Sequence, residues 1–179
     1  INYEEFSYKD KDQFYTPNET ATYCFNKFKL ICKEYGDSEK DYTYIEPSAG
    51  NGVFLKLFPK NRRIGMDIEP QHEDIITHDY LTWKPTKKEN KYCVMGNPPF
   101  GLRGQQALKF INHSAQFADY VCFILPQLFE SDGKGVPRKR VQGFNLIHSE
   151  KIESNFTYPD NKIVKVECIF QIWSKYKQN

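Results

Sequence analysis

Short apolar runs along the middle of the chain alternate with turn and helix signals. Five of these runs have the length of a buried strand and cover residues 42–46, 63–67, 75–77, 92–97 and 120–126. Between the fourth and the fifth run, residues 105–118 place their apolar side chains on one helical face. A strand, a helix and a second strand in this order predict a βαβ unit, and therefore a doubly wound α/β protein with a parallel sheet.

The two ends of the chain show different patterns. Thr16 and Glu19 can form a capping box around Pro17, and apolar residues then recur at three and four positions, which predicts a helix to about Tyr35. Near the other end, residues 144–152 and 163–173 have no helix between them, and the second segment alternates strictly between apolar and polar. We therefore expect seven strands, mostly parallel, closed by an antiparallel hairpin and covered by helices on both faces.

Length and composition restrict the class of protein. The 179 residues are 39% hydrophobic and 27% charged, which predicts one globular domain over residues 1–179 without a separate target-recognition domain. Apolar runs long enough to span a membrane are absent from the sequence, and the acidic, aromatic start is unlike a signal peptide. We therefore expect a cytoplasmic protein that is not secreted. The net charge of +2 permits an anionic partner but does not require one.

Cysteine and histidine spacing predicts neither disulfides nor metal. The cysteines are odd in number, form no C-x-x-C pair and lie within apolar stretches, so we expect buried free thiols at Cys24, Cys32, Cys93, Cys122 and Cys168. The four histidines lack the spacing of metal ligands, and no metal site is expected.

A glycine loop follows the first predicted strand, with the sequence Glu-Pro-Ser-Ala-Gly-Asn-Gly at residues 46–52. Gly50 and Gly52 allow the backbone to approach a ligand at the carboxyl end of the strand. A dinucleotide fold would have a third glycine where this chain has Leu55, which argues against a pyrophosphate. Asp67 ends the second strand, where a carboxylate can accept from both hydroxyls of a ribose or can simply be a solvated acid.

The third and fourth strands end in further candidates. Asp79 can accept from an adenine amino group, although an aspartate in a turn explains it equally well. Asn97, Pro98, Pro99 and Phe100 follow the fourth strand, and the two prolines remove two backbone donors. The Asn97 amide oxygen and the Pro98 carbonyl oxygen can then accept at one point, with the Phe100 ring beside them. Two acceptors next to an aromatic ring suit a planar –NH2 group.

With these motifs the chain resembles the class I S-adenosylmethionine-dependent methyltransferases, in the branch with the Asn/Asp-Pro-Pro-Phe/Tyr/Trp signature that methylates amino groups. The resemblance covers nearly the whole chain and implies the Rossmann-like fold of that class. It also implies an enzyme that uses S-adenosyl-L-methionine as its cofactor. Residues 13–17 further resemble the segment that lies over the cofactor in adenine-specific DNA methyltransferases of restriction-modification systems.

The resemblance assigns roles to individual residues. It implies catalytic roles for Asn97, Pro98, Pro99 and Phe100. It implies cofactor binding by Phe14, Tyr15, Thr16, Pro17, Glu46, Pro47, Ser48, Ala49, Gly50, Gly52, Asp67, Ile68, Asp79, Tyr80 and Asn97.

Two further segments are candidates for contact with the substrate. Phe156 or Tyr158 occupies the place where adenine methyltransferases carry a ring that packs on the extruded base, and for each a core or loop role is an equal alternative. Arg138, Lys139 and Arg140 belong to a basic loop after the fifth strand that can follow phosphates or can be a solvated loop.

The expected activity is methyl transfer to the exocyclic amino group of adenine in nucleic acid, with DNA favoured and RNA as the other candidate. The nucleic acid is then the partner, and a specificity subunit or a domain outside this chain can supply target recognition. Such an enzyme acts in the cytoplasm, the nucleoid or the nucleus, wherever its substrate lies. Two alternatives remain open: methylation of a protein glutamine amide, and a cofactor-binding subunit that is inactive without a partner.

Overall fold

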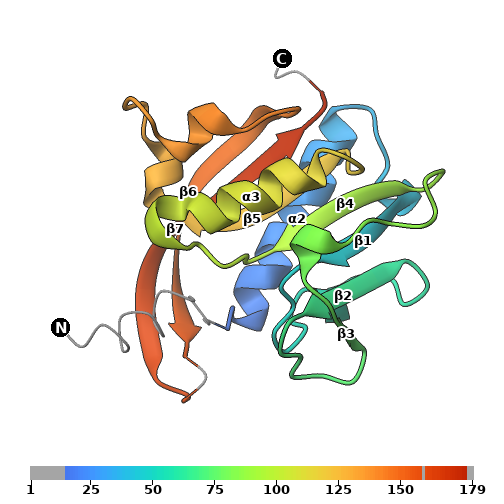
Figure 1. Cartoon of the computed structure of the whole chain (residues 1–179), viewed down its shortest axis with the longest axis horizontal. Coiled ribbons are helices and arrows are strands. Elements are labelled where there is room, and N and C mark those ends of the chain that lie inside the picture. Colours follow the sequence, from blue (N-terminus) through green and yellow to red (C-terminus); the bar gives the residue numbers. More distant parts are fainter. Residues whose placement is uncertain (1–14, 159, 177–179) are drawn as a thin grey trace.

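A seven-stranded sheet with the order β3-β2-β1-β4-β5-β7-β6 forms the middle of the molecule in the computed structural model, which describes residues 15–158 and 160–176 (Figure 1). Neighbouring strands are parallel from β3 to β5, whereas β7 runs antiparallel to both β5 and β6. The strands are β1 (Tyr42–Glu46), β2 (Arg63–Asp67), β3 (Ile75–Thr77), β4 (Lys91–Gly96), β5 (Tyr120–Pro126), β6 (Asn145–Thr157) and β7 (Ile163–Ser174). The predicted α/β fold with its C-terminal antiparallel hairpin is confirmed.

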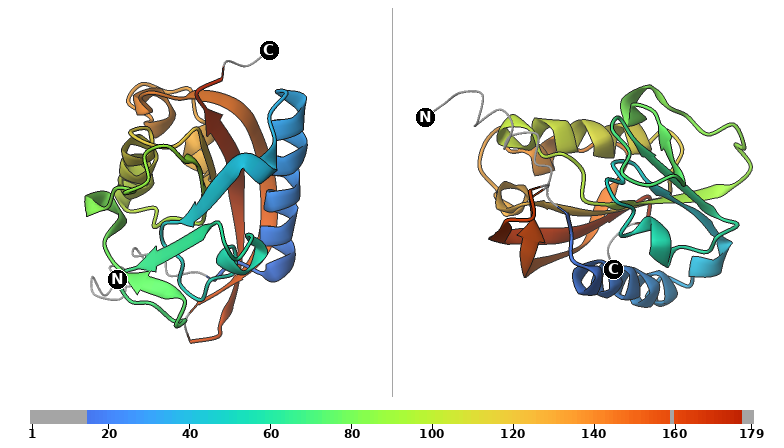
Figure 2. Two further views of the ribbon diagram at one scale, coloured as in Figure 1. Left: turned by 90° about the vertical axis from the view of Figure 1, so that its right-hand side faces the viewer. Right: turned by 90° about the horizontal axis from the view of Figure 1, so that it is seen from below.

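The two long helices cover opposite faces of this sheet. Figure 2 shows the sheet between α2 (Asn18–Glu34) and α3 (Gln105–Ser114). On the α2 side, the Phe28 ring meets Tyr120 at a centroid distance of 5.1 Å. On the α3 side, the fully buried Ile111 belongs to a second apolar cluster. Two separate cores, one on each face, hold the sheet between the helices.

The order in which strands are added to the sheet reverses at β1, so that β2 and β4 lie on opposite sides of it. The chain winds outward from β1 through β2 to β3, and then returns to pair β4 with the other side of β1. After β1 the backbone turns toward the α2 side, where Phe54 is in the core, and after β4 it leads into α3 on the other side. Open α/β sheets bind ligands at the carboxyl ends of strands beside such a switch point.

Several boundaries differ from the prediction. The capping box is not formed: α2 begins at Asn18 with Pro17 at the N-cap, and no side chain caps it. The glycine loop leads into a 3-10 turn at Leu55–Leu57 instead of a short α-helix. α3 ends at Ser114 instead of residue 118, and Ser114 donates through its hydroxyl to the Phe110 carbonyl. The strand β6 continues to Thr157, so residues 155–157 are strand and not loop.

All five cysteines are buried and free, as predicted. Among residues 15–158 and 160–176, no helix has both the length and the apolar character needed to cross a membrane. Within the same residues, no cluster of three or more His, Cys, Asp or Glu side chains is arranged to hold a metal ion.

Candidate functional site

A cavity of about 390 Å³ lies where β1, β2 and β4 end at the switch point. Its size falls within the usual range for small-molecule sites, and both polar and apolar groups line it. Other hollows in the described chain, such as one of about 540 Å³ lined by α2 and β6, are more open and lie elsewhere. The lining consists of Tyr15, Thr16, Glu46, Ser48, Ala49, Gly50, Asn51, Val53, Asp67, Ile68, Glu69, Gln71, Asn97, Pro99, Gly101 and Gln106.

The glycine loop after β1 is folded back onto β2. Gly50 and Gly52 adopt φ values of 55° and 81°, in the left-handed region that favours glycine. The Ala49 amide donates to the Met66 carbonyl at 2.9 Å, and the Gly50 amide donates to the Asp67 carboxylate at 2.8 Å. These bonds fix the loop as one wall of the cavity.

Tyr15 covers this loop from the other side. A Cβ on Gly50 would lie 3.3 Å from the Tyr15 ring, so the ring packs directly on the glycine backbone. Tyr15 and Thr157 exchange two backbone hydrogen bonds of 2.7 and 3.1 Å. The N-terminal segment therefore joins the glycine loop to the end of β6, although these segments lie far apart in sequence.

The Glu46 carboxylate forms part of the cavity and is 2% exposed. It accepts hydrogen bonds from the backbone amides of Leu55, at 2.8 Å, and Phe54, at 3.4 Å. Burial raises the pKa of this carboxyl well above its ordinary value, although the two amide bonds act in the opposite direction. Glu46 therefore positions the turn at Leu55–Leu57 relative to the end of β1.

Asp67 lies beside the glycine loop, at the end of β2, and also lines the cavity. One carboxylate oxygen accepts from the Gly50 amide at 2.8 Å, and the other accepts from the Glu69 amide at 2.9 Å. Each carboxylate oxygen can accept a second hydrogen bond. The side chain is only partly buried, so a fixed pair of acceptors lies beside open space.

Asn97 comes directly after β4 and belongs to the cavity lining. Its amide nitrogen donates to the Thr16 hydroxyl at 3.3 Å, and Thr16 is 5% exposed. Thr16 therefore holds the Asn97 amide instead of capping α2. Because the oxygen and the nitrogen of an amide lie on opposite sides of its carbon, this contact fixes the direction of the amide oxygen as well.

Asn97 is the first residue of the tetrapeptide at residues 97–100, and the other three residues are divided between the cavity and the protein interior. Pro99 lines the cavity and Pro98 is buried. The Phe100 ring is partly buried and packs against the core on the α2 side. The Phe100 carbonyl accepts from the amides of Gln106 and Ala107, which ties the tetrapeptide to the first turn of α3.

Several residues predicted to bind the cofactor are not part of the cavity lining. Asp79 is exposed and accepts from the Leu81 amide at 3.0 Å, which caps a 3-10 turn. The Tyr80 side chain is 1% exposed and hydrogen-bonds Ser114 in the core on the α3 side, so the side chain does not reach the cavity. Pro17, Pro47 and Gly52 support the loops behind the cavity instead of lining it. Phe14 lies outside the described residues.

Other lining residues were missed by sequence reasoning. Gln71 is brought to the cavity because its amide donates to the Gly50 carbonyl at 3.0 Å. Gly101 and Gln106 follow the tetrapeptide, and their proximity to it was a usable signal. The complete set of added lining residues is Asn51, Val53, Glu69, Gln71, Gly101 and Gln106.

The two candidate stacking rings occupy different environments. Phe156 is 1% exposed and belongs to the core on the α2 side, which agrees with the core alternative that the sequence left open. The reason is the extension of β6, whose alternation turns Ser154 and Phe156 inward. Tyr158 is partly exposed and directly follows Thr157, the partner of Tyr15.

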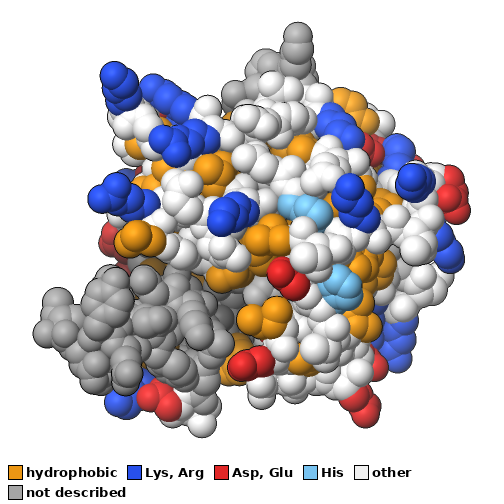
Figure 3. All heavy atoms as spheres, in the orientation of Figure 1, with side chains coloured by type: hydrophobic (Ala, Val, Ile, Leu, Met, Phe, Trp, Pro, Cys, Tyr) orange, Lys and Arg blue, Asp and Glu red, His pale blue; other side chains and the backbone are white. Residues whose placement is uncertain are grey.

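The basic segment after β5 is folded and not a free loop. Arg138 forms an ion pair with the Asp132 carboxylate, and the Lys139 ammonium donates to the Asp132 carbonyl at 2.6 Å. Pro137 is buried at the start of a 3-10 turn that ends at Arg140. Figure 3 shows Lys and Arg side chains gathered at the upper left, where Figure 1 draws the chain between β5 and β6.

Sequence comparison finds relatives among type II methyltransferases, whereas no protein-family profile matches the chain. M.CvrRI of Paramecium bursaria Chlorella virus XZ-6E is 30% identical over 107 residues, which are 52% of this chain and 26% of that protein. M.TthHB8I of Thermus thermophilus is 28% identical over 80 residues, 38% of this chain and 18% of that protein. The matched regions thus span about a quarter or less of these longer relatives.

Solved structures share the whole fold at low identity. A candidate RNA methyltransferase from Pyrococcus horikoshii has a TM-score of 0.65 and 17% identity, covering 93% of this chain and 88% of that one. The magnesium protoporphyrin IX methyltransferase of Synechocystis, solved with bound SAM, has a TM-score of 0.55 and 10% identity, covering 88% and 79%.

The type IIL restriction-modification enzyme MmeI, solved with DNA, matches over 99% of this chain but only 35% of its own, at a TM-score of 0.57 and 11% identity. Together these comparisons confirm the resemblance to class I methyltransferases and show that the chain has their Rossmann-like fold.

Proposed function

We propose that the chain is an S-adenosyl-L-methionine-dependent methyltransferase that acts on the exocyclic amino group of adenine in nucleic acid, with DNA as the preferred substrate. The observation that carries this proposal is the position of Asn97 in a cavity at the sheet's switch point, held by Thr16. The names of the related proteins support methyl transfer. The structural neighbour MmeI was solved in complex with DNA, which favours DNA over protein as the substrate.

The cavity residues fit S-adenosylmethionine. Asp67 offers two fixed acceptors for ribose hydroxyls, and the glycine loop leaves its backbone open to the methionine part. Ile68 is 68% exposed at the edge of the cavity and offers an apolar face to a purine. Bound there, the cofactor supplies a methyl group on a positively charged sulfur.

The tetrapeptide then has to position an amino group whose lone pair is delocalised into a ring. Two acceptors, the Asn97 amide oxygen and the Pro98 carbonyl oxygen, would take the two N–H groups and favour a pyramidal nitrogen. The lone pair would then be aimed across the cavity, and positioning supplies most of the rate enhancement. A strong base is not needed, because the amino protons become acidic as nitrogen forms its new bond.

An adenine in a polynucleotide must leave its stack to reach this site. Tyr158 lies on the chain that pairs with Tyr15 and is the aromatic residue we propose to pack on the extruded base. The basic segment that contains Lys139 and Arg140 would hold the phosphates on the same substrate. Target recognition by a subunit or domain outside this chain remains part of the proposal, because the relatives are much longer.

The Asn97→Ala variant tests the proposal. We expect unchanged S-adenosylmethionine binding by calorimetry and a loss of methyl transfer of at least about 100-fold, because one of two acceptors for the amino group is removed. Asn61→Ala, in the exposed turn before β2, is the matched control and should behave as the unaltered protein. Undiminished turnover by Asn97→Ala would contradict the assigned role.

The substrate class is tested separately. The protein is incubated with labelled S-adenosylmethionine and, in parallel, with duplex DNA, single-stranded RNA and cell lysate. Mass spectrometry then identifies the labelled nucleoside or residue. We expect N6-methyladenine from DNA; label in glutamine side chains would instead support protein methylation.

A further inference from the structure

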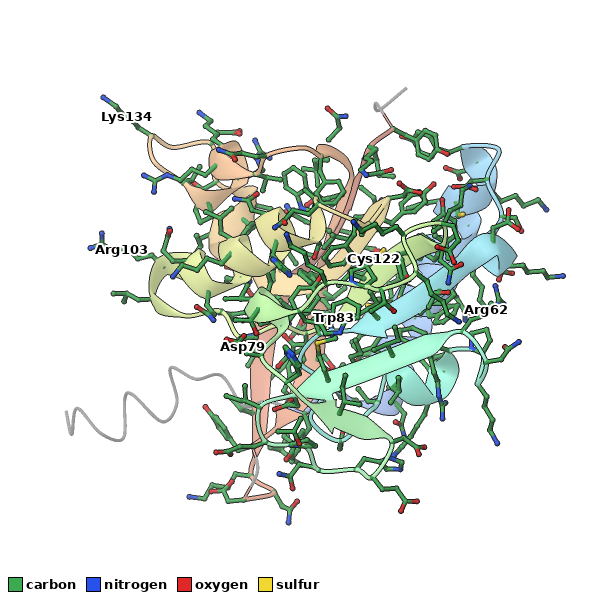
Figure 4. The ribbon with its side chains drawn as sticks, turned by 45° about the vertical axis from the view of Figure 1, so that its right-hand side comes forward. Arg62, Asp79, Trp83, Arg103, Cys122 and Lys134 are labelled. Atoms are coloured by element: carbon green, nitrogen blue, oxygen red, sulfur yellow. The ribbon has the colours of Figure 1, made fainter. Side chains whose placement is uncertain are left out.

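The loop between the tetrapeptide and α3 projects from the rim of the candidate site. Gly101 lines the cavity, and Leu102–Gly104 form a single 3-10 turn before α3 begins. Leu102 is 66% exposed, and Arg103 is exposed beside it. Figure 4 shows the Arg103 side chain extending outward from this loop. The turn therefore presents one apolar and one basic side chain next to Asn97.

The backbone of this turn has an unusual conformation. Gly101, Arg103 and Gly104 all have positive φ, at 71°, 55° and 70°. Arginine rarely adopts the left-handed region, and such residues persist where surrounding structure holds them, often at ligand sites. The conformation is what turns Leu102 and Arg103 away from the body of the protein.

Close packing on both sides holds the turn in place. A Cβ on Gly101 would lie 2.7 Å from Cβ of Gln106, and a Cβ on Gly104 would lie 2.9 Å from the Phe129 ring. The Phe100 carbonyl accepts from two amides of α3, which fixes the beginning of the loop. The exposed pair is thus carried on a rigid support, unlike the side chains of a mobile loop.

The neighbouring surface is basic. The same Cβ on Gly104 would lie 3.5 Å from Pro137, the first residue of the turn that carries Arg138, Lys139 and Arg140. That turn is attached to α3, because the Asn112 amide donates to the Arg140 carbonyl at 3.2 Å. An exposed apolar side chain with Arg103 next to it and a basic turn packed against the same loop matches a base stack bordered by phosphates.

We propose that Leu102 enters the base stack of duplex DNA at the position left by the extruded adenine, while Arg103 contacts the adjoining backbone. This inference rests on the proposed function and names how the same site obtains its base. A stacked base that turns outward leaves a gap of its own thickness, and apolar side chains are known to fill such gaps. We call the Leu102 side chain in this role the wedge. Because Gly101 lies at the rim of the cavity, the wedge would stand beside the path that the base takes to Asn97.

The test compares two forms of one DNA. Genomic DNA without adenine methylation is offered as duplex fragments or after heat denaturation, and N6-methyladenine is counted by mass spectrometry. For Leu102→Ala we expect methylation of duplex DNA to fall at least about tenfold, and methylation of single strands to change less than about twofold. Denatured DNA needs no wedge, because its bases are not held in a paired stack.

Two further variants serve as controls. Leu102→Met keeps an apolar side chain of similar length and should retain most duplex activity. Leu30→Ala removes a leucine that is 60% exposed on α2, on the opposite face of the sheet, and should leave both activities unchanged.

The possible failures are distinct. If Leu102→Ala loses the same factor on both forms of DNA, or loses nothing, the wedge is overturned while the proposed function stands. If the unaltered protein methylates neither form, the proposed function fails and the wedge fails with it.

Discussion

Carboxylates have different roles at the two ends of the parallel strands, which we call the amino edge and the carboxyl edge of the sheet. At the edge where β1, β4 and β5 begin, the Asp37 carboxylate accepts from the hydroxyls of Tyr42 and Tyr120. At the edge where β1 and β2 end, Glu46 and Asp67 accept from backbone amides of loops. The first arrangement encloses an acid between side chains of β1 and β5, with Lys91 of β4 nearby at 3.7 Å. The second places acids around a cavity.

The contrast extends to ionisation. Burial acts to raise the pKa of Asp37, but hydrogen bonds from Tyr42, Ser38 and Tyr120 outweigh it and hold the pKa below its ordinary value. Burial dominates at Glu46 and raises its pKa, since the two amide bonds are not sufficient to offset it. The surroundings of Asp37 thus favour its charged form, whereas burial shifts Glu46 toward its neutral form.

The comparison teaches where stability and function reside in this sheet. The Asp37 carboxylate joins elements together, because it accepts from tyrosine hydroxyls of two strands as well as from the Ser38 amide. The Asp67 carboxylate is held by backbone amides beside the cavity, and each of its oxygens can accept a further hydrogen bond from a ligand. Substitutions at the two edges should therefore have separable effects.

The largest expected effect is on cofactor binding at the carboxyl edge. Asp67→Ala removes both acceptors for the ribose, and we expect the affinity for S-adenosylmethionine to fall on the order of 100-fold. Titration calorimetry measures the change directly. Asp74→Ala, which removes an exposed acid near the start of β3, is the matched control. Unchanged affinity of Asp67→Ala would refute the ribose assignment.

The next effect is on stability at the amino edge. Asp37→Ala leaves two tyrosine hydroxyls without their acceptor, and we expect the free energy of unfolding to fall by about 2 kcal/mol. Urea unfolding followed by circular dichroism measures this loss. Asp37→Asn keeps an acceptor and should lose less. The affinity of the folded variant for S-adenosylmethionine should not change; a parallel loss of affinity would break the proposed separation of the two edges.

The smallest effect is a difference in pH dependence. Because the folded pKa of Glu46 lies above its ordinary 4.5, the unfolded chain ionises first, and stability falls as the pH rises from 4.5 to the folded value. The folded pKa of Asp37 lies below 3.8, so its contribution is present above 3.8 and is lost as the pH falls through the folded value.

Urea unfolding from about pH 3 to about pH 8 separates these two contributions. Glu46→Gln should remove the loss of stability on the alkaline side, and Asp37→Asn should reduce the loss on the acid side. If both variants altered the same side of the profile, the opposite ionisation of the two edges would be wrong.

The buried strands were predicted well because their signal is local. The bounds of β1, β2, β3 and β5 agree with the predicted runs. The clearest case is β5, because a strand covered on both faces reads as a continuous apolar segment. The location of Asn97, Asp67 and the glycine loop around one cavity was predictable for a related reason. In a parallel sheet the carboxyl ends of neighbouring strands meet at one edge.

The errors concern side chains whose partners are distant in sequence. Thr16 has the right spacing for a helix cap, but the Asn97 amide, 81 residues away, takes its hydroxyl. Phe156 was open to a stacking role until β6 proved to extend past residue 152 and to turn the ring into the core. Tyr80 follows the candidate Asp79, yet α3 covers it and bonds its hydroxyl.

The sequence alone determined the order of strands and helices, the chemical types at each strand end and the resemblance that those motifs carry. These features depend on local periodicity and on short spacings, which a chain encodes directly. The tertiary structure decided which face each side chain takes, that Tyr15 joins the glycine loop to β6, and that Leu102 and Arg103 project beside the site. Those features depend on packing between segments that are remote in sequence, and local patterns do not contain that information.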